Sequence, residues 1–456
     1  MNPKKAILPA VILFTAALAS PTFAAPGVVV QKQGDGTVVS WQPYGIVCST
    51  GCPVTSKTYA VGTTVQLMAE PGVGARFDHW EGTCTGTNPL CTITVSALHL
   101  TKAVFTPVTG LPACPVLNAT SQIYGVFPVM PANLTGVTPV GEVDATGHTF
   151  PNWHMFATVN PTPTPVGYDP VYSPVTGKVI SVMRTRGSPA EMWDYYIRFA
   201  NCAEVEIMVA IVNNVDPAWE AAFGFSAAPS GNILERSDPA ALWINEGTYL
   251  GLVNLNKRKI ALEAYDKRKP TAAFYDLGRY RAIHAYLQCP IDYFTTPIQT
   301  AVNLHLPGAA CGRADQDVPG ALQGNWFFYG DGNLNGDAVR SLDQKAHIAF
   351  VKNATGTRLI SMANTTLRAG VIMPPSPIYT VNAAEPAFHL VTPASGLVCY
   401  TLAGAGGADT NRSLLVKMDN NTILRTKIST TACAALGAAT IESAAPADNP
   451  IVRFSR

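Results

Sequence analysis

The stretch that decides the fold at the start of the chain runs from residue 36 to residue 105: GTVVSWQPYGIVCSTGCPVTSKTYAVGTTVQLMAEPGVGARFDHWEGTCTGTNPLCTITVSALHLTKAVF. Short apolar-rich segments alternate in it with Gly-rich or Pro-Gly breaks, which is typical of short strands joined by turns. We therefore predict a small all-β sandwich over residues 27–107. The expected strands are VVVQ (28–31), TVVSW (37–41), KTYAV (57–61), TVQLMAE (64–70), CTITV (91–95) and KAVF (102–105).

Two pairs of cysteines lie close in sequence inside this stretch. They are Cys48 with Cys52, and Cys84 with Cys91. Each pair is placed to close one loop by a disulfide. Such bridges stabilise a module of about 80 residues, because the hydrophobic core of so small a unit is limited.

The same stretch resembles the bacterial repeat modules related to internalin-type B-repeats. The shared pattern is carried by Gly36, Gly45, Ile46, Cys48, Cys52, Tyr59, Gly62, Thr63, Leu67, Ala69, Pro71, Phe77, Trp80, Gly82, Cys84, Cys91, Ala103 and Phe105. One departure is His79, which stands where a Gly usually precedes the Trp. The resemblance implies a β-rich stalk or spacer of exported and surface proteins, without catalysis, and we expect Trp80 in its core.

Composition limits what the whole chain can be. At about 150 residues per domain, the chain has room for about three domains. The formal net charge is +1, only 13% of residues are charged, and the sequence has no polybasic stretch. Nucleic acid and anionic membrane surfaces are therefore not expected as partners.

The first residues are typical of an export signal. Lys4 and Lys5 precede the apolar run AILPAVILFTAALA, and small residues suit cleavage after Ala24 or Ala25. We expect residues 1–24 to be removed, leaving a secreted or periplasmic protein without a membrane span. All ten cysteines follow this segment, and an even count in an exported chain favours disulfides.

Residues 113–300 predict a second β domain. VYSPVTGKVISVM (171–183), DYYIRFANCAEVEIMVAIVN (194–213) and INEGTYLGLVNLNKRKIALEAYD (244–266) each combine strands with a turn. Asp216 and Pro217 predict the start of a short helix. These pieces resemble the β-sandwich hybrid scaffold of lysostaphin-type peptidoglycan endopeptidases over residues 145–270. The resemblance is carried by Ser173, Pro174, Gly177, Val179, Gly247, Leu250, Gly251 and the strand from Ile260 to Asp266.

That family implies a hydrolytic zinc centre, which takes three protein ligands and an activated water. His154 stands at the first ligand position, but Thr158 occupies the Asp position. The strand expected to carry H-x-H has Lys259 and Glu263 and no imidazole. We therefore predict a degenerate, peptidase-like domain that has lost catalysis and needs no cofactor.

Other candidate groups remain open at this stage. His148 and His154 could bind zinc, with Asp144 or Glu142 adding a carboxylate; a loop whose histidines make hydrogen bonds is the favoured alternative. A structural role is also favoured for His284. Glu263 and Asp266 lie three apart, on opposite faces of a strand, so we interpret them as a solvated charge and a turn residue rather than a glycosidase pair.

Residues 310–456 predict a small β-barrel or sandwich of sequential antiparallel strands. Cys399 and Cys433 could bridge neighbouring strands, whereas Cys114, Cys202, Cys289 and Cys311 allow several pairings. Asp331, Asn333 and Asn335 have the spacing of a calcium loop. Leu342 stands where the bidentate carboxylate belongs, so a plain polar turn is favoured over a calcium site.

The leading hypothesis is a mostly β, exported, non-catalytic protein that binds cell-wall glycan, stem peptides or another surface protein. Trp153, Trp193, Trp243 and Trp326 are candidates for a carbohydrate-binding face, although large aromatic residues are usually buried. One alternative is a zinc-dependent peptidoglycan endopeptidase with an atypical ligand set around His148 and His154. Another is a structural adhesin or fibre subunit.

Overall fold

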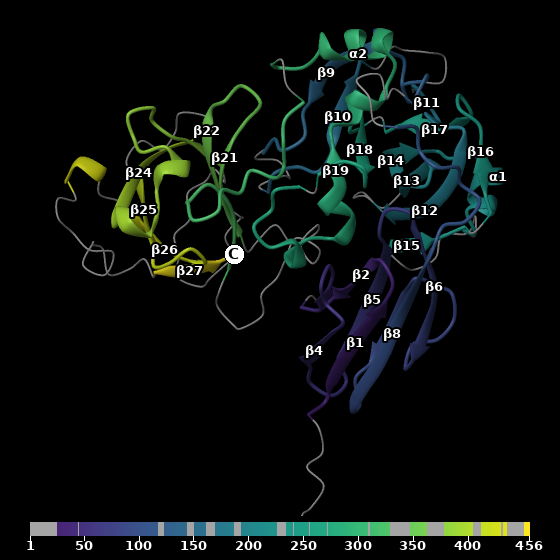
Figure 1. Cartoon of the computed structure of the whole chain (residues 1–456), viewed down its shortest axis with the longest axis horizontal. Coiled ribbons are helices and arrows are strands. Elements are labelled where there is room, and N and C mark those ends of the chain that lie inside the picture. Colours follow the sequence, from purple (N-terminus) through teal and green to yellow (C-terminus); the bar gives the residue numbers. More distant parts are fainter. Residues whose placement is uncertain are drawn as a thin grey trace, which may run out of the picture.

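The structure is a computed structural model in which three β-rich bodies meet (Figure 1). It describes residues 25–43, 45–116, 123–143, 150–160, 169–186, 193–225, 234–239, 241–254, 256–270, 272–308, 311–328, 347–362, 378–404, 412–429, 432–435 and 451–456. The predicted mostly β fold class is confirmed. No helix among these residues is long and apolar enough to cross a membrane.

The first body, which we call the repeat module, is a sandwich of two four-stranded sheets with the orders β4-β1-β8-β6 and β3-β2-β5-β7. Alternate residues of its strands point inward, so that Val28, Val38, Leu67 and Trp80 form one apolar core. The strands are β1 (Gly27–Gln33), β2 (Gly36–Gln42), β3 (Val47–Cys48), β4 (Val54–Thr58), β5 (Thr64–Pro71), β6 (Ala75–Gly82), β7 (Leu90–Thr94) and β8 (Leu98–Pro107).

The second body, the middle domain, is built on one eleven-stranded sheet with the main order β15-β12-β13-β14-β18-β10-β9. Its central strand β14 (Val205–Asn213) is buried along its whole length, because the sheet is covered on both faces. Asp216 caps the predicted helix α1 (Pro217–Ala222) by accepting from the Ala218 N–H. The other elements are β9 (Leu134–Thr138), β10 (Met155–Val159), β11 (Pro170–Tyr172), β12 (Gly177–Arg186), β13 (Trp193–Cys202), β15 (Leu234–Ser237), β16 (Trp243–Ile244), β17 (Tyr249–Val253), β18 (Lys259–Asp266), β19 (Leu287–Gln288) and α2 (Thr296–Asn303).

The third body is a closed barrel of sequential strands from β20 to β27. Trp326, Phe350, Tyr379 and Tyr400 are fully buried in its interior, so the barrel is a packed core and not a container. The strands are β20 (Gly324–Phe328), β21 (His347–Lys352), β22 (Arg358–Met362), β23 (Ile378–Thr380), β24 (Leu397–Gly404), β25 (Arg412–Met418), β26 (Ile423–Ser429) and β27 (Val452–Ser455).

The repeat module does not stand away from the rest of the chain as a spacer would. Val73 of its β5–β6 loop is fully buried in an apolar cluster of the middle sheet. Beside it, Arg198 donates to the carbonyl of Pro71 (2.9 Å) and ion-pairs with Glu206, whose carboxylate accepts from the Gly74 N–H (2.7 Å). These charges are buried and mutually paired, so the module is docked specifically.

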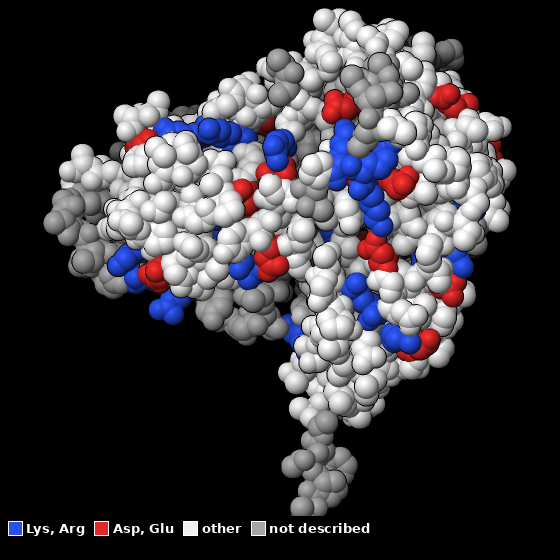
Figure 2. All heavy atoms as spheres, viewed as in Figure 1, with Lys and Arg blue, Asp and Glu red and all other residues white. Residues whose placement is uncertain are grey.

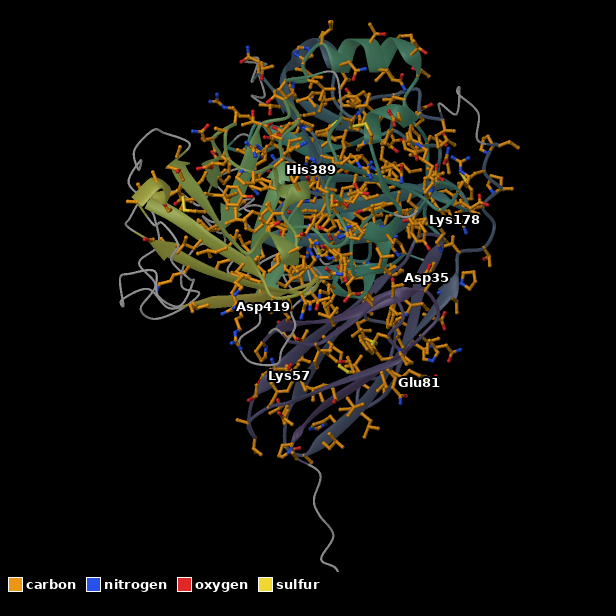
Figure 3. All side chains as sticks on the ribbon, turned by 60° about the vertical axis from the view of Figure 1, so that its left-hand side comes forward. Asp35, Lys57, Glu81, Lys178, His389 and Asp419 are labelled. Carbon is orange, nitrogen blue, oxygen red and sulfur yellow. A yellow bond between two sulfur atoms is a disulfide. The ribbon has the colours of Figure 1, made fainter. Side chains whose placement is uncertain are left out.

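Further ion pairs surround this contact. Asp35, labelled in Figure 3 where the module meets the middle domain, pairs with Lys267 (2.6 Å). Glu70 pairs with Arg236 (3.5 Å) and with Arg281 (3.3 Å). The spacer implied by the family resemblance is therefore replaced here by a packed interface.

Residues 272–288, which we call the hub segment, join all three bodies. They include the short helices η2 (Leu277–Arg279) and η3 (Ala282–Tyr286). The repeat module reaches the hub segment through Ser49, which donates to the Tyr280 carbonyl, and through Thr37, which accepts from the Ala282 N–H. The barrel reaches it through Asn325, whose amide donates to the Tyr280 hydroxyl (3.3 Å). Tyr280 is 1% exposed, so its packing links the three cores.

The ten cysteines form five disulfides within the described residues. Two close the short loops at 48–52 and 84–91, and a third joins Cys399 to Cys433. The four cysteines whose pairing the sequence left open are joined as Cys114–Cys202 and Cys289–Cys311.

Candidate functional site

His154 lies directly before β10, at the point where β10 pairs with β18. Met155 is opposite Leu262 in the antiparallel register, which places His154 opposite Glu263. The His154 Nδ1 forms an ion pair with the Glu263 carboxylate. Asn152 holds the neighbouring backbone by accepting from the His154 N–H (3.2 Å). The expected zinc ligand His154 is thus engaged by Glu263. This carboxylate comes from β18, the strand in which the family resemblance predicts the H-x-H motif.

Glu263 is buried, with 2% of its surface exposed. Residues alternate along β18, so Glu263 faces the same way as Ala261 and Tyr265, which pack against Val73 of the repeat module. Burial alone would raise the pKa of the Glu263 carboxyl. The imidazole of His154, with smaller contributions from His284 and Arg281, instead brings that pKa below its ordinary value.

The hub segment packs beside this pair, in the same cluster as Val73. His284 of η3 is 2% exposed and stacks on the ring of Trp153, with 4.3 Å between ring centroids. Its other stacked neighbour is Tyr265 of β18, at 6.5 Å. We therefore find His284 in an aromatic layer over the sheet, in line with the structural role expected for it.

The arrangement does not form a set of metal ligands among the residues that the structure describes: no group of three His, Cys, Asp or Glu side chains there is placed to hold a metal ion. Thr158 lies on β10 opposite Lys259. Glu142 accepts from the backbone N–H of Ala354 in the third body (3.3 Å). His148 and Asp144 lie outside the described residues, as do Asp331, Asn333 and Asn335 of the calcium-like turn.

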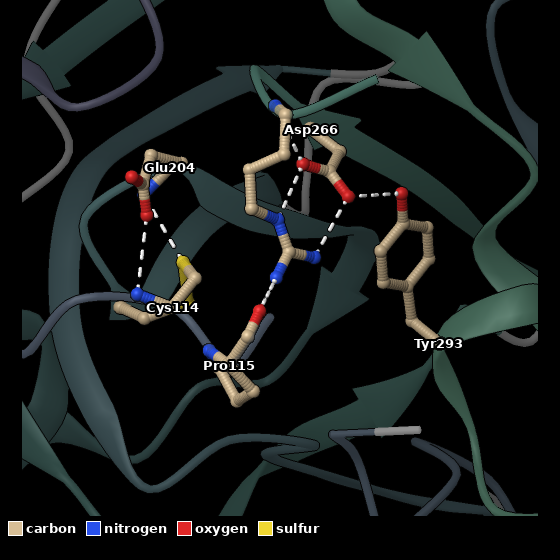
Figure 4. Close-up of a disulfide and its surroundings, with 7 residues drawn as sticks. Cys114, Pro115, Glu204, Asp266 and Tyr293 are labelled. Carbon is tan, nitrogen blue, oxygen red and sulfur yellow. Dashed lines mark hydrogen bonds and ion pairs between the residues drawn. A yellow bond between two sulfur atoms is a disulfide. The ribbon is translucent and has the colours of Figure 1, made fainter. Parts of the chain in front are cut away.

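Our interpretation of Glu263 as a solvated charge is wrong, because its side chain is buried. Asp266 does end β18 at a turn, where its carboxylate accepts from the Arg268 N–H (2.9 Å), but it is buried as well. Asp266 is 0% exposed, accepts two hydrogen bonds from the Arg268 guanidinium (2.9 Å each) and one from the Tyr293 hydroxyl (2.9 Å) (Figure 4). Burial acts to raise its pKa, but these partners lower it. A sequence signal was present, because from Ile260 to Tyr265 the strand carries no charged or amide side chain apart from Glu263, on either face.

Arg268 also fastens the segment that leaves the repeat module. Its guanidinium donates to the Pro115 carbonyl beside the Cys114–Cys202 disulfide. The Cys114 N–H donates to the Glu204 carboxylate (3.1 Å). The start of the middle domain is thereby held to the end of β13.

The surface carries few charges for its area. Figure 2 shows a face that is mostly uncharged, with Lys and Arg gathered over the middle domain and acidic side chains beside them. Of the four tryptophans suggested for a carbohydrate face, Trp153 and Trp326 are buried and Trp193 is partly buried. Trp243 is 49% exposed, beside the ammonium of Lys178.

Comparisons with known proteins bear on the repeat module and little beyond it. Residues 46–109 match the family model described as "Divergent InlB B-repeat domain". Comparison with curated proteins found no significant match. A solved structure, "Structure of Helicobacter pylori Csd3 from the hexagonal crystal", is similar at 10% sequence identity and a TM-score of 0.21, over 51% of this chain and 48% of that chain. The chain thus spans about half of that protein, and its N-terminal module is similar to the divergent InlB B-repeat family.

Proposed function

We propose that the chain is an extracytoplasmic protein that binds a cell-wall or surface component and does not hydrolyse it. The observation that carries this proposal is the buried ion pair between His154 and Glu263. A catalytic zinc site keeps one position open to water and substrate. Here the carboxylate is 2% exposed and is already engaged by the His154 imidazole.

Two further features support the extracytoplasmic setting. Five disulfides are typical of proteins that fold in an oxidising compartment. The match to a bacterial surface repeat fits the same setting. The docked module is also joined to the middle domain by buried ion pairs and apolar contacts, which suits a protein that presents a preformed surface to a partner.

The test uses the full mature chain in three parallel measurements: metal analysis, turnover of muropeptides and retention on insoluble peptidoglycan. We expect sub-stoichiometric zinc, no product, and retention on the insoluble fraction. The variant His154→Ala, used at a temperature at which circular dichroism shows it to be folded, should keep its retention. His389→Ala is the control, because His389 is an exposed histidine of the third body (Figure 3).

Two other outcomes would replace the proposal. One zinc per chain, lost in His154→Ala together with hydrolysis, would identify a peptidase with an atypical ligand set. Self-association in sedimentation experiments without retention on peptidoglycan would identify a structural adhesin subunit.

A further inference from the structure

Two hollows lie side by side where the middle domain meets the barrel. The first, of about 480 Å³, is lined by residues that include Arg313, Gln316 and Lys352. The second, of about 440 Å³, lies along the edge strand β9 and is lined by residues that include Glu142. The hydrogen bond from the Ala354 N–H to the Glu142 carboxylate forms the wall between them. Together we call them the seam groove, and their volumes are those of sites for small ligands.

The groove is preformed by close backbone contacts. Gly141 and Gly312 both adopt positive φ (80° and 77°). A Cβ at Gly141 would lie 1.9 Å from the Arg313 carbonyl oxygen, and one at Gly312 would lie 2.0 Å from that of Val140. Only glycine permits this approach. The Cys289–Cys311 disulfide anchors the same wall, so little ordering is left for a ligand to induce.

Lys352 is held in place by a side chain of the opposite wall. The Gln316 amide accepts from the Lys352 N–H (2.7 Å) and donates to the Lys352 carbonyl (2.8 Å). These two bonds fix the end of β21 beside the segment that enters the barrel. The Lys352 side chain itself is exposed at the groove.

The charges of the groove are arranged unequally. In the first hollow the acidic side chains are held by backbone donors: Asp315 accepts from the Ala273 N–H (2.7 Å), and Asp317 accepts from the N–H groups of Tyr275 (2.8 Å) and Asn325 (2.7 Å). The third carboxylate, Glu142, lies between the hollows and accepts from the Ala354 N–H (3.3 Å). The Arg313 side chain is 69% exposed although it pairs with Asp315. A ligand that enters therefore meets the ammonium of Lys352 and the outer edge of Arg313, and its negative end is favoured there.

The remaining lining combines hydroxyl, amide and backbone groups with small apolar side chains and the His305 imidazole, and no Phe, Tyr or Trp is among the described residues of either hollow. Sugar rings are usually bound against an aromatic face. Peptides are bound instead through hydrogen bonds to their main chain and through their charged ends.

We propose that the seam groove binds a short polar peptide with a free carboxylate, which Lys352 and Arg313 receive. This site rests on the proposed function and selects the peptide component over the glycan as the ligand. The hydroxyls of Thr135, Thr138 and Thr158 line the far hollow and hydrogen-bond the polar chain.

The test is fluorescence anisotropy with the full mature chain and an N-terminally labelled tetrapeptide, Ala-Gln-Lys-Ala, as the free acid and as the C-terminal amide. The acid should bind about tenfold more tightly than the amide, because one charge-assisted hydrogen bond is lost. Lys352→Glu should weaken binding of the free-acid peptide by about tenfold or more, and should leave the melting temperature of the protein unchanged. Lys417→Glu, a charge reversal on β25 of the same barrel, is the matched control and should not alter affinity.

The opposing outcomes are equally defined. The proposed site would be overturned if the free acid and the amide bound with equal affinity, or if neither bound. It would also be overturned if Lys352→Glu left the affinity for the free acid unchanged. Binding of an N-acetylglucosamine tetrasaccharide that disappears in Lys352→Glu would assign the groove to glycan and also overturn it. Retention of the wild-type chain on insoluble peptidoglycan, measured alongside, separates the two claims: retention without peptide binding rejects the groove and leaves the proposed function standing.

Discussion

Replacing one partner of the His154–Glu263 pair should destabilise the protein by an amount that its burial sets. Removing one member of a buried ion pair costs about 3–5 kcal/mol, because the other charge stays behind without compensation. The Glu263 side chain is 3% exposed and that of His154 is 19% exposed. We expect His154→Ala, which strands the carboxylate, to lie near the upper end of this range. Glu263→Ala should lie lower, because the His154 side chain that is left behind is partly exposed to solvent.

The double variant distinguishes an ion pair from two separate packing contributions. If the two side chains act as a pair, the loss in His154→Ala/Glu263→Ala is smaller than the sum of the single losses by more than about 1 kcal/mol. Denaturant unfolding followed by circular dichroism measures the three losses, with the exposed His389→Ala as control. Additivity within about 0.5 kcal/mol would refute the reasoning.

The same pair gives the protein a pH dependence of known sign. The pKa of Glu263 lies below its unfolded value of 4.5, so the folded protein binds the proton less readily than the unfolded chain does. Its contribution is fully present above the unfolded pKa and is lost as the pH falls through the folded pKa. The stability difference between wild type and Glu263→Gln should therefore shrink below about pH 4.5. A difference that stays constant into acid would contradict this.

Three more variants test the joints between the bodies. Tyr280→Ala should cost about 3–5 kcal/mol in denaturant unfolding, because it empties a site shared by three cores; a loss under about 1 kcal/mol would contradict that role. Replacing Cys114 and Cys202 together by Ala should cost about 4–5 kcal/mol, since the bridge closes a long loop, and a melting temperature equal to that of wild type would argue against it. Gly141→Ala should cost about 1–3 kcal/mol in denaturant unfolding, because the Arg313 backbone must move to make room for the Cβ. It should also weaken binding of the free-acid peptide. An unchanged affinity in the anisotropy assay would show that this backbone contact does not shape the binding site.

Local patterns in the sequence predicted most elements of the fold. Most strands of the repeat module and the Asp216-capped helix follow from alternation, turn residues and a capping side chain, all of which act within a few residues. The strands β3 and β6 were not among those expected, and the strand expected over 57–61 lies at Val54–Thr58. The disulfides Cys48–Cys52 and Cys84–Cys91 were predictable in the same way, because their partners lie close together in the sequence. The pairing of Cys114 with Cys202 does not, because four cysteines allow three connectivities and only the folded chain selects one.

The candidate site was predictable in part. His154 was identified as the first ligand position, and the missing imidazoles of β18 were visible in the sequence. The burial of Glu263 was missed because spacing alone was considered. A carboxylate between Leu262 and Ala264, in a strand apolar on both faces, has no route to solvent and needs a cation. The docking of the module was not predictable, since Glu70 and Arg281 are brought together only by the tertiary fold.

The ion pair, the module and the seam groove are physically connected through the hub segment. Arg281 pairs with Glu70 of the module and also lowers the pKa of Glu263. The same segment donates from Tyr275 to Asp317, which lines the groove. Undocking the module would therefore remove the Glu70 partner of Arg281, which is the cation near Glu263, and would loosen one wall of the groove through residues already in contact. The buried His154–Glu263 pair and the wall of the groove are thus linked through one segment, the hub segment.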